Sequence, residues 1–218
     1  MIAKVTKNPM GGARRTVALA LLAAACLAPA AAAAQARPAP SPDGLPPQER
    51  EMLALAQEFS RRCSEAMEKW IANKEVTEDQ LFAALYYPVA KTDPPKFTTD
   101  WDRLSDRDIQ GIEESVMSRS ASLIFAVLVD RNGYLPTHDL RYSQPLTGNL
   151  ANDLVNNRTK RIFNDRTGLA AARSTAPFLV QRYMRDTGET MADLSVPVMV
   201  RGIHWGAVRL GFRAVDAR

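Results

Sequence analysis

The segment Leu123-Ile-Phe-Ala-Val-Leu-Val-Asp-Arg-Asn-Gly-Tyr-Leu-Pro-Thr-His138 decides the fold that we expect for this chain of 218 residues. Residues 123–129 are aliphatic or aromatic without interruption, which is typical of a buried central strand. Asn132-Gly133 is a strong signal for a hairpin turn. The chain should therefore return as a second strand over residues 134–138, with Pro136 near an edge or a strand end.

Strand-like segments recur towards the C-terminus. Three further strands are predicted at residues 178–185, 194–200 and 204–213. The polar, Arg-rich stretch between the two groups of strands, residues 141–176, holds weak helical pieces around 150–163 and 169–172. Two strands, a helical crossover and three more strands predict an α+β fold built on a five-stranded antiparallel sheet.

The N-terminal third is expected to be helical. Apolar residues from Met52 to Trp70 keep the i, i+3, i+4 spacing of one long amphipathic helix. Thr77 and Gln80 are spaced as a capping box for a short helix, and Ser105 suits the N-cap of a third. The apolar stripe of the long helix should pack on the sheet or on a partner chain.

The first 36 residues have the features of an export signal. Basic residues precede an apolar run over 16–27, and Ala34-Gln-Ala36 is a small-x-small cleavage site. We therefore expect a periplasmic protein with a signal peptide over 1–36. Two variants stay open: lipid anchoring at Cys26, and twin-arginine rather than Sec export through Arg14-Arg15.

The net charge of +4 comes from the expected signal peptide, which holds four basic residues and no acidic one. Residues 37–218 are therefore neutral, and nucleic acid is not an expected partner. Residues 37–47 are rich in proline and predict a stiff linker ahead of one domain over 48–218. Within the neutral part, residues 37–119 are net acidic and residues 120–218 net basic. The two halves complement each other, or the arginines line an anion site.

Three long segments carry a family resemblance. They are Asp130–His138, Asn157-Arg-Thr-Lys-Arg-Ile-Phe-Asn-Asp-Arg-Thr-Gly168 and Gly202-Ile-His-Trp-Gly206. Together they resemble the Cache or PAS-like sensor module of bacterial methyl-accepting chemotaxis receptors, over roughly Pro47 to Phe212. The resemblance implies the PAS/Cache-like plan for the sheet and its helices. It also implies that the domain binds a small ligand and does no chemistry.

In those receptors the module belongs to a larger signalling protein, whereas no signalling region follows it in this sequence. We therefore expect it to signal through a partner, such as a membrane receptor or kinase, or to buffer its ligand. The resemblance also suggests a homodimer through the first helix. The alternative functions are a protein-interaction module without ligand and a haem or metal binder.

Candidate ligand-binding residues come from the predicted sheet and its crossover. The assigned set is Tyr134, His138, Arg158, Arg161, Arg166, Arg173, Tyr183, Arg185 and His204. The two histidines fall on inner strand faces, where a histidine is a pocket wall, a hydrogen-bonded core group or a metal or haem ligand. The arginines suit a carboxylate or phosphate, which makes the expected ligand anionic; their alternative role is ion pairing with nearby acids.

Catalysis is not indicated. The sequence contains no nucleophile-elbow motif, phosphate-binding glycine loop or zincin helix. The absence of a Cys-x-x-Cys-His motif excludes covalent haem attachment, and the two histidines lack the close ligand spacing of a metal site. We therefore expect no enzyme activity, no cofactor and no bound metal. Cys63, the only cysteine outside the expected signal peptide, should be a buried, inert thiol.

Overall fold

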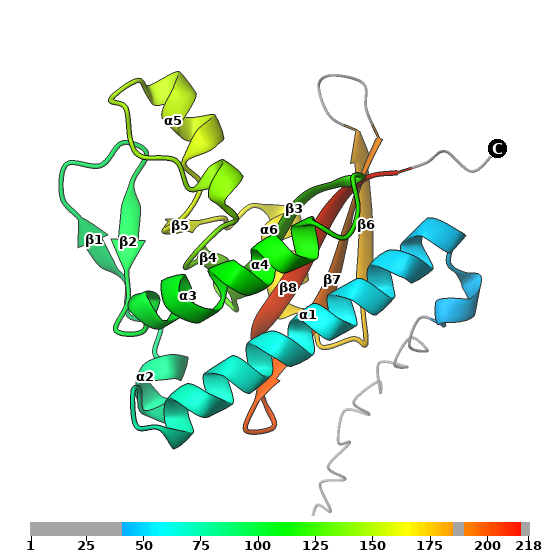
Figure 1. Ribbon diagram of the computed structural model, residues 1–218, viewed down its shortest axis with the longest axis horizontal. Coiled ribbons are helices and arrows are strands. Elements are labelled where there is room, and N and C mark those ends of the chain that lie inside the picture. The colour runs from blue at the N-terminus through cyan, green and yellow to red at the C-terminus, as the bar shows by residue number, and fades with distance from the viewer. Residues whose placement is uncertain (1–40, 185–189, 215–218) are drawn as a thin grey trace, which may run out of the picture. The chain divides into compact units, whose positions relative to one another are not determined.

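A four-stranded antiparallel sheet forms the centre of the computed structural model, which describes residues 41–184 and 190–214 (Figure 1). Its strands lie in the order β3-β8-β7-β6. They span Leu123–Asp130 (β3), Ile203–Arg213 (β8), Thr190–Val200 (β7) and Leu179–Met184 (β6). The expected signal peptide with Cys26, residues 37–40 of the expected linker, and residues 185–189 with Arg185 lie outside the described residues.

Helix α1, Pro47–Ala72, covers one face of this sheet and contacts β7 and β8. Proline at its first position suits a helix start, because the missing N–H has no partner there. Its predicted apolar stripe is buried against its own sheet, from Met52 to Trp70. A homodimer through α1 would therefore have to use the remaining polar face.

The other N-terminal elements pack around α1. The capping box of α2, Glu78–Phe82, is confirmed, since Thr77 and Gln80 exchange side-chain and backbone hydrogen bonds. The prediction that Ser105 caps a helix is wrong. Ser105 lies buried inside α3, Asp102–Asp108, which is followed by α4, Gln110–Met117, against β3. A short 3-10 helix, η1 (Pro42–Gly44), precedes α1.

The five-stranded sheet was also an error, because the second strand does not join the main sheet. That strand is only β4, Tyr134–Leu135, and it pairs with β5, Arg161–Ile162. The carbonyls of Gly133 and Leu135 accept the N–H groups of Phe163 and Lys160, at 2.8 Å each. Pro136 has no N–H to continue the ladder, so the strand ends before it.

The first helix of the crossover between β4 and β6 is shorter than expected. It holds η2 (Leu140–Tyr142), α5 (Leu150–Asn156) and α6 (Arg166–Arg173). A small hairpin of β1 (Tyr87–Val89) and β2 (Lys96–Thr98) lies beside it, with the Phe97 N–H bonded to the Lys160 carbonyl. Helix α6 packs on β7 and β8 across a small second core that includes Val127 and Ala172. The α+β class is confirmed.

Among the described residues, no helix combines the length and apolar character needed to cross a membrane.

Candidate functional site

A pocket of about 370 Å³ opens on the face of the sheet that α1 does not cover. Strands β3, β8 and β6 supply its floor, and the crossover from β4 to α6 supplies its walls. The lining residues are Phe125, Val127, Leu135, His138, Arg158, Phe163, Asp165, Thr167, Tyr183 and Arg209. A concave site with apolar surface and a few convergent polar groups has the character of a small-molecule site.

Arg209 of β8 is the polar centre of the floor. Its guanidinium forms an ion pair with Asp193 on the neighbouring strand β7, and the Asp193 side chain is completely buried. Burial disfavours the charged form of Arg209, but the Asp193 carboxylate outweighs burial, so the pKa of Arg209 lies above its ordinary value. Arg209 therefore stays charged in the pocket floor.

Phe125 and Gly211 shape the floor beside Arg209. A Cβ at position 211 would lie 2.1 Å from the ring of Phe125, so only glycine lets this ring lie flat on the strand. The guanidinium of Arg209 in turn lies 5.8 Å from the centre of the same ring. This cation–π contact holds the guanidinium over the floor.

Arg158 brings a second guanidinium to the pocket from the turn after α5. It lies 5.0 Å from the ring centre of Phe163, which also lines the pocket. Arg161 lies 4.9 Å from the same ring but does not line the pocket, and it donates to the Leu154 carbonyl. The two pocket arginines are thus each placed against a pocket aromatic.

His138 forms a buried part of the wall. Its Nδ1 lies 2.8 Å from an Asp139 carboxylate oxygen, an electrostatic contact whose angles do not meet those of a hydrogen bond. Burial lowers the pKa of His138, with Asp139 opposing this effect, and the net shift is downward. The imidazole is therefore neutral near pH 7. Its proton is favoured on Nδ1, facing the carboxylate, which makes Nε2 an acceptor.

The far side of the pocket comes from α6 and β6. Asp165 caps α6, accepting the Gly168 N–H at 3.0 Å. Thr167 follows in the first turn of the helix, and its carbonyl accepts the Gln181 side chain of β6 at 3.0 Å. This bond ties the helix to the strand that carries Tyr183.

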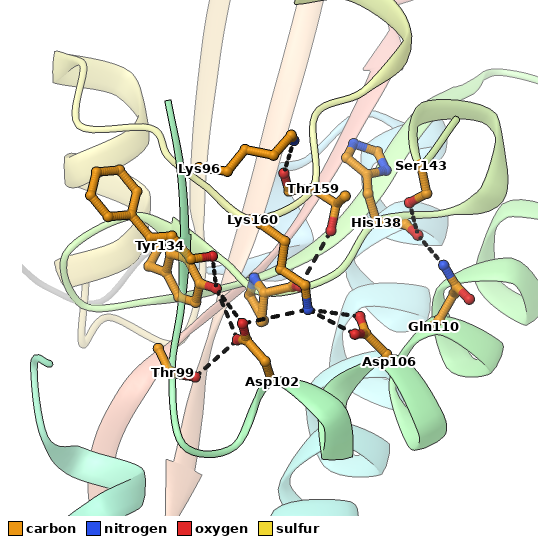
Figure 2. Close-up of polar contacts among 12 residues, drawn as sticks. Lys96, Thr99, Asp102, Asp106, Gln110, Tyr134, His138, Ser143, Thr159 and Lys160 are labelled. Atoms are coloured by element: carbon orange, nitrogen blue, oxygen red, sulfur yellow. Dashed lines mark hydrogen bonds and ion pairs between the residues drawn. The ribbon is translucent and has the colours of Figure 1, made fainter. Parts of the chain in front are cut away.

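The His138 wall is held from behind by helix α4. Figure 2 shows the His138 carbonyl accepting two hydrogen bonds, from Gln110 of α4 at 3.0 Å and from the Ser143 hydroxyl at 2.8 Å. Ser143 thus bonds to the backbone of His138 and not to its ring. Between β4 and the isolated bridge of Ser143 with Asn157 the segment belongs to no strand, and these side-chain bonds help to fix its path.

A second polar cluster, at the base of the same wall, anchors β4 and β5 to α3 (Figure 2). Lys160 bridges Asp102 and Asp106, and the Tyr134 hydroxyl donates to Asp102 at 2.8 Å. Nearby, the buried Lys96 donates to the Thr159 carbonyl. Burial lowers the pKa of Lys96 to about 8. These bonds are structural supports outside the pocket lining.

The structure brings together three residues of the predicted ligand set. His138, Arg158 and Tyr183 line the pocket. Five described residues do not: Tyr134, Arg161, Arg166, Arg173 and His204. Arg166 and Arg173 are exposed on α6, where Arg173 donates to the Arg131 carbonyl. The ninth residue, Arg185, lies outside the described residues.

Tyr134 and His204 miss the pocket for reasons of strand geometry. Tyr134 points into the α1-side core, and the strand stops before alternation reaches His138, so the shared face predicted for the two is wrong. At His204 a bulge opposite Val198/Met199 shifts the alternation of β8. Trp205 therefore joins Val208 in the core in place of His204.

Sequence reasoning missed seven lining residues. They are Phe125, Val127, Leu135, Phe163, Asp165, Thr167 and Arg209. For two of them, Arg209 and Val127, the alternation of side chains along a strand predicts the correct face of the sheet. If Val208 and Leu210 face the core, then Arg209 between them faces the other side of the sheet. The same reasoning separates Val127 from Leu128. The wall residues carry no such signal, because their placement depends on the irregular crossover.

The two histidines do not converge. His138 lies in the pocket wall, whereas His204 is half-buried near the β7–β8 turn and is not among the lining residues. In the part of the chain that the structure describes, no three or more His, Cys, Asp or Glu side chains cluster as metal ligands.

Protein-family models give no match to this chain, and no curated protein matches it at the required significance.

Proposed function

We propose that this domain binds a small anionic organic molecule in the pocket on the open face of its sheet. The observation that carries the proposal is the convergence of Arg158, Arg209 and the neutral His138 on one cavity. Guanidinium groups match carboxylate and phosphate in both charge and planar donor geometry. A neutral imidazole adds a hydrogen-bonding group without adding charge.

The aromatic lining supports this function. Phe125 and Phe163 each lie under a pocket guanidinium. An arginine already held against a ring loses less side-chain freedom when a ligand arrives, which favours binding. The rings also offer apolar surface to the body of the ligand, while its anionic group meets the guanidiniums.

The wider proposal is that the domain is an exported sensor of the Cache or PAS-like type, located in the periplasm. An antiparallel sheet with a long helix on one face and a pocket on the other is compatible with that plan. The domain would signal through a membrane receptor or kinase, or as a homodimer, without turning over its ligand.

The test is a thermal-shift screen of the purified protein against small carboxylates and phosphate esters. A ligand present at a hundred times its dissociation constant should stabilise the fold by about 2.7 kcal/mol, a rise in Tm of roughly 5–10 °C. Comparing native with denaturing mass spectra of the same protein reveals any ligand that co-purifies. Amines and neutral sugars serve as the negative set.

Arg158→Gln and Arg166→Gln form a matched pair for any anion that binds. Both replace an arginine of the crossover, but only Arg158 lines the pocket. Loss of a charge-assisted hydrogen bond should weaken binding by about 1.5–3 kcal/mol in Arg158→Gln and leave Arg166→Gln unchanged. Equal effects, or stabilisation by amines alone, would contradict the anion proposal.

A further inference from the structure

Exposed apolar side chains gather at one end of the domain. Eight of the eleven large hydrophobic residues that are exposed in the described part of the chain come from two segments, residues 85–89 and 140–155. They are Leu85, Tyr87, Val89, Leu140, Leu146, Leu150, Leu154 and Val155, which we call the α5 surface. A concentration of this kind marks a surface that contacts something other than water.

The two segments meet where α5 lies beside the β1–β2 hairpin. Leu146 and Leu150 line one shallow pocket with Lys91, which sits between β1 and β2. Leu150 and Leu154 are four residues apart and share a face of α5. The 3-10 helix η2, which begins at Leu140, contacts α5. Figure 1 shows α5 and the hairpin as neighbours at one end of the domain.

The charges around the α5 surface are mostly positive where they meet solvent. Residues 85–98 and 139–161 carry six basic side chains and three acidic ones. Asp139, Asp153 and Lys96 are buried, Lys160 is paired with Asp106, and Arg158 lines the ligand pocket. Lys91 and Arg141 are exposed, as is one acid, Asp93. The surface thus combines aliphatic side chains with positive charge.

We propose that the α5 surface docks on an anionic membrane surface. Aliphatic side chains flanked by Lys and Arg are the pattern by which short elements lie in the lipid headgroup region, held jointly by apolar burial and lipid charge. Seven of the eight residues are Leu or Val. Those types are under-represented among the hot spots of protein–protein interfaces, which favour Trp, Tyr and Arg.

Docking on lipid is independent of the ligand proposal, because none of the eight residues lines the ligand pocket. The test is co-sedimentation of the full chain with vesicles of phosphatidylcholine alone or mixed with phosphatidylglycerol. The chain should sediment with the mixed vesicles, and added salt should release it because salt screens the lipid charge.

Two double variants distinguish docking through the α5 surface from non-specific adsorption of exposed apolar side chains. Leu150→Ser/Leu154→Ser changes side chains that are 45% and 40% exposed, and the control Met199→Ser/Ile203→Ser changes side chains that are 43% and 45% exposed at the β7–β8 turn. The first should weaken vesicle binding about tenfold or more, and the control should bind as the unchanged chain does. Unaltered thermal melting of both variants confirms that they fold.

A dye on Val155→Cys, in a Cys26→Ser background, reports on the surface directly. Cys63 is completely buried, and burial raises its pKa, so it stays unlabelled. Mixed vesicles should shift the dye emission to the blue, whatever residues 1–40 contribute to sedimentation. An unshifted dye with mixed vesicles would overturn the proposal. So would a self-association that Leu150→Ser/Leu154→Ser abolishes in the absence of lipid, since the surface would then join two copies of this chain.

Discussion

A single carboxyl group, that of Glu113, links helix α4 to the edge of the sheet. Its Oε1 accepts the Leu128 N–H of β3 at 3.2 Å, and its side chain is completely buried. Strand β3 is an edge strand, so an N–H that points away from β8 needs a partner other than a strand. Burial raises the pKa of Glu113 well above its usual range, and the nearby Asp139 and Glu114 add to the effect.

Glu113→Gln should remove a pH dependence of stability. Because the folded-state pKa is raised, the protonated group stabilises the fold fully at low pH, and that stability is lost as pH rises through the folded pKa. Glutamine keeps the acceptor for Leu128 and cannot ionise. The Tm of Glu113→Gln should therefore gain on the unchanged protein as the pH rises from about 5 to about 8. Parallel curves of Tm against pH would contradict this.

At the residue scale the sequence predicted some residues of the pocket and missed others. His138 was expected in the pocket from a strand face and Arg158 from an arginine cluster in a helical piece; both line the pocket, although neither lies in a strand or helix. Arg209 was missed although the alternation of β8 between the core residues Val208 and Leu210 places it on the opposite face. His204 was wrongly included because nothing in the sequence announces the bulge near it.

At the scale of elements, α6 both closes the pocket and depends on a residue of its wall. Asp165 caps the helix through the Gly168 N–H. A Cβ at Gly168 would lie 2.6 Å from the Phe163 carbonyl, so the first turn of the helix sits tightly on the strand end. The same carboxylate places negative charge at the rim of a pocket that we propose to bind anions.

Asp165→Asn separates these two roles. Asparagine is as good an N-cap as aspartate, so the free energy of unfolding should change little, whereas Asp165→Ala should cost about 1 kcal/mol. Removing the charge should tighten the binding of any anion found in the thermal-shift screen. Calorimetric titration of both variants measures this. Weaker binding by Asp165→Asn would mean that the carboxylate itself holds the ligand.

Elements with a regular hydrophobic pattern were predictable from the sequence. Elements whose ends depend on a proline or on hydrogen bonds to distant residues were not. The long helix and strand β3 follow the expected ranges closely. The second strand failed because Pro136 and the bonds to residues 160–163 end it after Leu135. Without strand pairing beyond Leu135, the side chains from Tyr134 to His138 do not keep the alternation of a strand. The hairpin of β1 and β2 lies in a stretch for which no strand was predicted.

Across the whole molecule, the acidic first half and the basic second half are joined by ion pairs. Glu49 of α1 pairs with Arg182 of β6, and Glu68 pairs with Arg201 at the β7–β8 turn. Lys160 adds its bridge to α3. The charge asymmetry therefore reflects complementarity within one domain as well as the arginines of the pocket.

Arg182→Ala should destabilise the domain more than Arg201→Ala. Glu49 is 3% exposed, and removing its partner leaves a buried carboxylate without compensation, at a cost of about 2 kcal/mol or more. The Glu68–Arg201 pair is solvated on both sides and should contribute less than about 1 kcal/mol. Urea unfolding at constant pH measures both. Equal losses of unfolding free energy in the two variants would show that the burial of Glu49 does not make its ion pair more important than the exposed one.

The two faces of the sheet use different side chains of the same strands. The core under α1 takes Leu128 and Val208, whereas the pocket takes Val127 and Arg209. Because neighbours along a strand point to opposite sides, a change in the pocket lining leaves the packing under α1 in place, and its cost is confined to the second core and to the buried Asp193 that Arg209 pairs with. The α1 side of the sheet is in this sense a scaffold for the pocket side. Evolution or protein engineering can change ligand specificity through substitutions on the pocket face, while the face under α1 continues to supply most of the stability of the fold.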